Sequence, residues 1–124
     1  ARKKSGLAKY RHVRLLDRSA ARKSADILRC GFSHEACGRK FTYWQEKLGY
    51  IGGGCREAGE NIAWGSGSLG TVRSIFNAWM HSPGHRAAIL SRNYTEIGIG
   101  NKRGEFDGYS GSSVWVQQFG HRGC

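Results

Sequence analysis

The sequence contains one proline, only nine acidic residues, and no stretch close to the ~20 apolar residues that a membrane-spanning helix needs. The lack of such a stretch argues against a transmembrane segment. With 124 residues, 39% of them hydrophobic, the chain is long enough to bury one core and too short for two. We therefore expect a single domain over residues 1–124.

The shortage of acidic residues against twenty Lys and Arg leaves a net charge of +11. A predicted basic helix near the N-terminus carries a candidate polyanion-binding row on one face, formed by Arg11, Arg14, Arg18 and Arg22. An anionic polymer or membrane surface is the partner that this row predicts, and a merely solvated face is the alternative. Sequence-specific nucleic-acid binding is not expected, because no base-reading motif is present.

No two of the four cysteines are spaced as Cys-x-x-Cys, which argues against structural zinc and thioredoxin-type chemistry. The even count in a small domain instead predicts two disulfides formed in an oxidising compartment. Three pairings are open. We favour Cys30 with Cys37, which brackets a short turn, and Cys55 with Cys124, which ties down the C-terminus.

Apolar residues at helical spacing predict helices, and alternating or continuous apolar runs predict strands. The predicted helices cover 10–29, 39–48, a segment that begins after Thr71, and 83–90, and the predicted strands cover 60–64, 95–100 and 114–119. The last two strands are expected to pair antiparallel, with a long mobile connection over 101–113. Helices that mostly precede strands indicate an α+β domain.

The same spacing predicts the buried faces of the second and third helices, which are Phe41, Trp44 and Leu48, and Val72, Ile75, Phe76 and Trp79. Ser82 precedes Pro83, so we expect its hydroxyl to cap the fourth helix rather than to act as a nucleophile. The run over 65–70 matches G-x-G-x-x-G, but the chain lacks the downstream acid and the length of a dinucleotide-binding fold. A glycine-rich turn is therefore expected there.

Five motifs occur in an order that resembles the bacterial branch of the CAP superfamily, which takes its name from cysteine-rich secretory proteins, antigen 5 and pathogenesis-related proteins and is also called SCP. They are Phe-Ser-His at 32–34, Gly-Glu-Asn-Ile-Ala at 59–63, Ala-Trp-Met at 78–80 with Ser-Pro-Gly-His-Arg at 82–86, Thr-Glu-Ile-Gly-Ile-Gly at 95–100, and Trp-Val-Gln-Gln-Phe-Gly at 115–120. The resemblance implies an α-β-α sandwich with a small antiparallel sheet between helices. Together with the predicted disulfides, it also implies a secreted, extracellular protein.

The resemblance further implies a central cleft that gathers two histidines and two acids. His34, Glu60 and His85 match three of these positions, whereas Ser82 stands where eukaryotic relatives have the second acid. Two imidazoles and a carboxylate can ligate zinc with water in an open position, which makes His34 and His85 candidate metal ligands and zinc a candidate cofactor. Because the second acid is missing, we favour a structural or ligand-orienting role for the cleft.

These observations predict a secreted, monomeric, noncatalytic binding or defence-type module. The resemblance suggests a lipid, a sterol or a divalent metal as its ligand. The alternative is a metal-assisted hydrolase that uses His34, Glu60 and His85. A further alternative is a polyanion-binding module that acts through the basic N-terminal helix.

Overall fold

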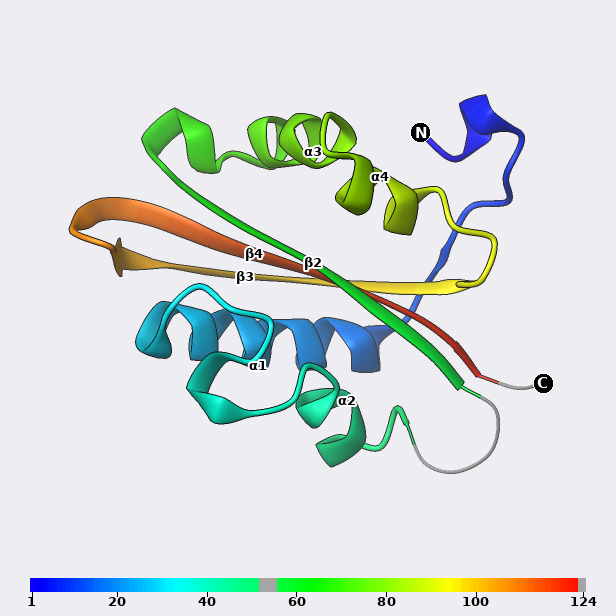
Figure 1. Cartoon of the computed structure of the whole chain (residues 1–124), viewed down its shortest axis with the longest axis horizontal. Helices are drawn as coiled ribbons and strands as arrows, with labels where there is room; N and C mark the ends of the chain where they lie inside the picture. The colour runs from blue at the N-terminus through cyan, green and yellow to red at the C-terminus, as the bar shows by residue number, and fades with distance from the viewer. Residues whose placement is uncertain (52–55, 123–124) are drawn as a thin grey trace.

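The computed structural model describes residues 1–51 and 56–122. Within these residues a mixed sheet lies between two layers of helices (Figure 1). The α-helices are α1 (Arg14–Cys30), α2 (Tyr43–Lys47), α3 (Val72–Met80) and α4 (Pro83–Ile89), and the 3-10 helices are η1 (Lys3–Ser5), η2 (Ala36–Gly38) and η3 (Gly67–Gly70). The strands are β1 (Arg11–His12), β2 (Arg56–Ser66), β3 (Glu96–Phe106) and β4 (Tyr109–Arg122).

The described strands form a sheet in the order β1-β3-β4-β2, in which β4 pairs antiparallel with both β2 and β3. Only the two-residue strand β1 pairs in parallel, along β3. Helices α1 and α2 cover one face of the sheet, and α3 and α4 cover the other (Figure 1). The α+β class and the α-β-α sandwich predicted from the sequence are thus confirmed. No helix in the described part of the chain is both long and apolar enough to span a membrane.

Close packing of α1 on the sheet depends on two glycines of β3. A Cβ atom at Gly98 would collide with the backbone of Leu16, and one at Gly100 would collide with the backbone of Ala20. Because glycine has no Cβ, α1 can lie directly on the strand and bury Leu16, Ala20 and Ile27 completely. The remaining face of the sheet packs Ile75 and Trp79 of α3 against Phe119 and Ile89.

The first helix begins later than its apolar spacing predicted. Val13 has extended backbone dihedrals, and the N–H groups of Arg11 and Val13 donate to the carbonyl oxygens of Thr95 and Ile97. Pairing with β3 therefore removes residues 10–13 from the predicted helix. Arg11 consequently lies in β1, which corrects its placement in the helical row of Arg14, Arg18 and Arg22.

The prediction of a long, mobile connection between the last two strands is wrong. Strands β3 and β4 continue through it and form a hairpin, whose turn contains Asp107 and Gly108. Both of these residues have positive φ, of 51° and 83°, as tight hairpin turns require. The antiparallel pairing itself is confirmed.

Two of the predicted buried faces are only partly buried. On α3, Ile75 and Trp79 are buried, but Val72 and Phe76 are exposed, so the stripe that faces the sheet is narrower than predicted. The second helix is shorter than predicted, and Phe41 lies before it with an exposed ring. Helix α3 begins after Thr71 as predicted, and Thr71 caps it, because its hydroxyl oxygen accepts a hydrogen bond from the Ser74 N–H at 3.2 Å.

Candidate functional site

Glu60 is the buried centre of the candidate site, with a side chain only 1% exposed. It lies in β2 directly opposite Gln118 of β4, whose Nε2 atom donates to Glu60 Oε2 at 2.8 Å. The other carboxylate oxygen, Oε1, lies 2.8 Å from His34 Nδ1 and 3.2 Å from Lys23 Nζ. Three elements of the fold therefore hold this carboxylate through both of its oxygens.

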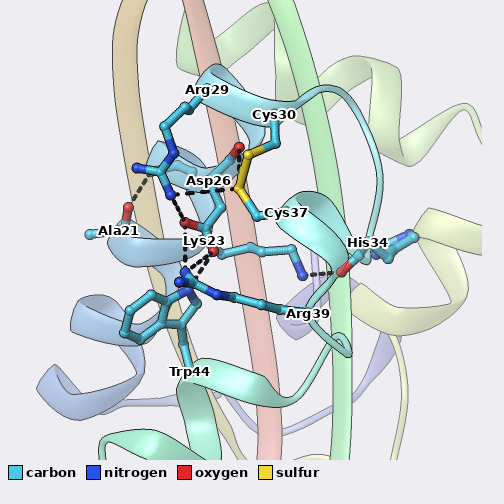
Figure 2. A network of polar contacts seen from close by, with 10 residues as sticks. Ala21, Lys23, Asp26, Arg29, Cys30, His34, Cys37, Arg39 and Trp44 are labelled. Carbon is cyan, nitrogen blue, oxygen red and sulfur yellow. Dashed lines mark hydrogen bonds and ion pairs between the residues drawn. A yellow bond between two sulfur atoms is a disulfide. The ribbon is translucent and has the colours of Figure 1, made fainter.

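Lys23 also belongs to this group and was not predicted from the sequence. Its side chain projects from α1 and is 3% exposed, and its ammonium group also donates to the carbonyl oxygen of His34 (Figure 2). A signal was present, because Lys23 follows Ala20 by three residues and precedes Ile27 by four, which places it on the buried side of α1. A lysine on the apolar face of a helix needs a buried partner, and Glu60 supplies one.

The segment that carries His34 is fastened at both ends. The predicted disulfide between Cys30 and Cys37 is confirmed and closes this segment into a loop. The predicted pairing of Cys55 with Cys124 lies outside the described residues.

Buried Asp26 links the residues on either side of the loop that carries His34. Its carboxylate accepts hydrogen bonds from Arg29 and Arg39 at 3.0 Å each, and from Trp44 Nε1 at 2.7 Å (Figure 2). The end of α1 and the start of α2 are thereby tied together on either side of the loop. The position of the His34 imidazole is thus set by the surrounding network.

One face of His34 remains open. Its side chain is 50% exposed and lines a cavity of about 400 Å³, together with Glu35, Phe41, Gly59 and Glu60. The exposed ring of Phe41 therefore lies beside a fixed imidazole. The cavity offers a ligand the His34 imidazole and the apolar Phe41 ring, with the Glu35 side chain also in the lining, and the Glu60 carboxylate is already engaged.

His85 lies at the start of α4, and its imidazole Nδ1 is 2.7 Å from the hydroxyl oxygen of Ser82. The prediction that this hydroxyl caps the helix is wrong: Ser82 occupies the N-cap position, but its side chain makes no capping hydrogen bond. Asn61 of β2 fixes the same helical turn, because its Nδ2 atom donates to the carbonyl oxygen of His85 at 3.0 Å.

His34 acts electrostatically on His85. Burial lowers the pKa of His85 below its usual range, and the charge of nearby His34 lowers it further. His34 and Glu60 are in direct contact, whereas His85 is not among the residues that line the His34 cavity. The structure thus brings His34 and Glu60 together and places His85 beside them with a separate partner, Ser82.

The donor set does not fit a zinc site with three protein ligands. Residues 1–51 and 56–122 contain no group of three or more His, Cys, Asp and Glu side chains that could hold a metal ion. Glu60 is held by Lys23, His34 and Gln118, and each imidazole already uses Nδ1. The Nε2 atoms of His34 and His85 are the donors that this arrangement leaves, fewer than the three protein ligands of catalytic zinc sites.

Comparison with known proteins gives a consistent result over nearly the whole chain. The family model described as CAP, the cysteine-rich secretory protein family, matches residues 1–119. The uncharacterized protein YkwD of Bacillus subtilis (strain 168) is 35% identical over 121 residues, which cover 95% of this chain and 42% of that protein. The chain thus spans less than half the length of this relative.

Solved structures share the fold at lower identity. An outer surface protein from Borrelia burgdorferi superposes with a TM-score of 0.76 at 20% identity, covering 98% of this chain and 84% of that one. An extracellular protein containing a SCP domain from Bacillus anthracis gives a TM-score of 0.76 at 22% identity, covering 98% of this chain and 36% of that one. At these identities the likeness concerns the fold.

Proposed function

The chain belongs to the cysteine-rich secretory protein (CAP) family, and we propose that it is a secreted, noncatalytic binding domain whose ligand contacts the imidazole of His34. Secretion is supported by the Cys30–Cys37 disulfide and by solved neighbours described as extracellular or outer surface proteins. Fractionation of cells that produce the full-length protein should recover it outside the cytoplasm, and recovery in the cytoplasm would contradict the proposal.

The burial and the contacts of the Glu60 carboxylate are the observation that supports a noncatalytic role. A general base must reach the proton that it abstracts, and a metal ligand must offer a lone pair to the metal. The Glu60 carboxylate is buried, and both of its oxygens are already engaged by Lys23, His34 and Gln118 within the fold. Its role in this proposal is to hold His34 at the edge of the cavity.

An amphipathic ligand, such as a lipid or sterol with one polar group, matches the two kinds of contact in the cavity. The exposed Phe41 ring supplies apolar surface, and the His34 imidazole supplies a hydrogen-bonding group beside it. Burial of an aromatic side chain by such a ligand is favourable, and the imidazole would fix the ligand's orientation.

Titration with a fluorescent sterol and a fluorescent fatty acid tests this proposal. Phe41→Ala and His34→Ala should each weaken binding of one of these probes, by about tenfold for Phe41→Ala. His12→Ala is the matched control, because His12 lies in β1 at the opposite edge of the sheet from β2 and is also exposed. Affinities that are unchanged in both cavity variants, or no binding of either probe, would contradict the proposal.

The same protein can be used to test the hydrolase alternative. Metal analysis of protein purified without a polyhistidine tag should find substoichiometric zinc, because His34 and His85 alone provide too few donors. Zinc at one equivalent that is lost in both His34→Ala and His85→Ala would favour the hydrolase.

A further inference from the structure

A second cavity lies at the end of the sheet that carries the turn between β3 and β4. This end of the sheet is on the left in Figure 1. The cavity has a volume of about 420 Å³ and is formed by the end of β2, the η3 turn and the turn between β3 and β4. Its lining consists of Trp64, Gly65, Ser66, Leu69, Asp107 and Tyr109. None of these residues lines the His34 cavity.

Two aromatic rings meet in this cavity. The centroids of the Trp64 and Tyr109 rings are 5.9 Å apart, and the ring planes are inclined by 41°. Trp64 also packs edge-on against buried Phe106, which fixes its orientation from the other side. Tyr109 is 55% exposed, so much of its ring surface remains available to a ligand.

The charge of the cavity is opposite to that of the protein. No Lys, Arg or His lines it, although the chain has twenty Lys and Arg. Its one charged residue is Asp107, whose side chain has no hydrogen bond or ion pair within residues 1–51 and 56–122. Five other carboxylates of the described chain form ion pairs with basic groups, namely Asp17, Asp26, Glu46, Glu60 and Glu96, whereas Glu35, Glu57 and Glu105 resemble Asp107 in having none there.

We propose that this cavity binds an organic cation, specifically a quaternary ammonium group such as the one that choline carries. The faces of aromatic rings attract cations through their quadrupole, and pockets that combine such rings suit alkylated ammonium groups. Trp64 and Tyr109 supply the rings, and Asp107 supplies the compensating negative charge. Leu69 and Gly65 supply apolar contacts for the methyl groups.

Calorimetric titration with choline chloride tests the proposal directly, with sodium chloride matching the ionic strength. The matched ligand is 3,3-dimethyl-1-butanol, which has the shape of choline but no charge. Choline should bind at least about fivefold more tightly than this neutral analogue. Equal affinities would overturn the proposal, because the cavity would then be recognising shape and apolar surface alone. Failure of choline to bind would overturn it as well.

Variants locate the binding within the molecule. Asp107→Asn removes the charge while keeping a residue type that tolerates the positive φ of this turn, so it should weaken choline binding without unfolding the hairpin. Glu57→Gln is the matched control, since Glu57 is an exposed carboxylate near the opposite end of β2 from Trp64 and does not line this cavity. Tyr109→Phe should keep the affinity, whereas Tyr109→Ala should reduce it. Equal effects of the Asp107 and Glu57 variants would overturn the assignment.

Two sources of the cation can be separated with vesicles. If the natural ligand is a lipid headgroup, phosphatidylcholine vesicles should co-sediment with the protein, and free choline should compete. If choline binds but the vesicles do not co-sediment, the site takes a free cation. If vesicles bind equally well to Asp107→Asn, their binding does not involve this cavity, and the lipid source is overturned.

Discussion

Lys23 Nζ lies 3.2 Å from Glu60 Oε1, and the two side chains are 3% and 1% exposed. Removing one partner of a buried ion pair leaves the other charge without compensation. Glu60→Gln should therefore lower the free energy of unfolding by about 3–5 kcal/mol, as measured by urea denaturation.

Two comparisons make this expectation specific to the pair. Glu57→Gln changes an exposed carboxylate in the same strand and should shift stability by less than about 0.5 kcal/mol. The double variant Lys23→Met/Glu60→Gln removes both charges, so it should be less destabilised than the sum of its two single variants. Strict additivity would show that the two groups do not stabilise each other.

The residues of this site that could be predicted are those that lie in short, recognisable sequence motifs. His34, Glu60 and His85 lie in short motifs that resemble a known family, and the first helix was predicted to end at residue 29, one residue before its observed end at Cys30. Lys23 was not predicted, because one basic residue among several in an amphipathic helix looks like part of the solvated side. Its partner is 37 positions away, and only the tertiary fold brings the two together.

The other failures have different causes, and not all of them are tertiary. Ser82 has the residue type and position of a helix cap, but its hydroxyl contacts the imidazole of His85, one turn later, instead. Strand β1 is two residues long, too short for any periodicity to show. The hairpin does have a local signal, because Asp107-Gly108 is a sequence typical of tight turns and lies within the segment for which a mobile connection was predicted.

Acid stability should depend on Glu96. Burial alone would raise the pKa of this carboxyl, but hydrogen bonds from Arg122, Tyr50 and Arg11 outweigh burial and lower the pKa to about 2. A carboxyl with a lowered pKa in the folded state stabilises the protein fully above its unfolded value of 4.5. This contribution, about 3 kcal/mol, is lost as pH falls from there through about 2.

Glu96→Gln should therefore flatten the pH dependence of stability in this acidic window. Chemical denaturation at intervals between pH 2 and pH 6 measures the effect. Glu105→Gln serves as the control, because its exposed carboxylate has no such network in the described chain. A variant curve parallel to that of the wild type would show that Glu96 does not carry the acid sensitivity.

Polyanion binding should depend on Arg14, Arg18 and Arg22, which lie four residues apart on α1 and are all exposed. Replacing these three with Gln should lower the salt concentration that elutes the protein from heparin. The slope of log affinity against log salt concentration should become shallower by roughly two to three. Arg11 is left out, since it forms an ion pair with Glu96.

The matched control removes the same charge from the other helical layer. Arg73, Arg86 and Arg92 are exposed in or beside α3 and α4, and replacing them with Gln changes the net charge equally. If the two triple variants elute together, heparin responds to total charge and not to a surface on α1.

The pKa of His85 is expected to depend on His34. Burial is the larger cause of its lowered pKa, and the charge of His34 is the smaller one. For an imidazole, a lowered folded-state pKa means that the unfolded chain binds more protons just below the ordinary value of 6.5. The His85 contribution to stability is therefore present above this pH and is lost as pH falls below it.

His34→Gln keeps a side chain that can donate to Glu60 but removes the titrating charge, so it isolates the electrostatic part of this dependence. The pKa of His85, followed by NMR of the imidazole signals, should rise in this variant and still stay below the ordinary value, because burial remains. His12→Gln changes an exposed histidine at the far edge of the sheet and should leave the His85 titration unchanged. If His34→Gln also leaves it unchanged, the charge of His34 does not act on His85, and burial alone lowers the His85 pKa.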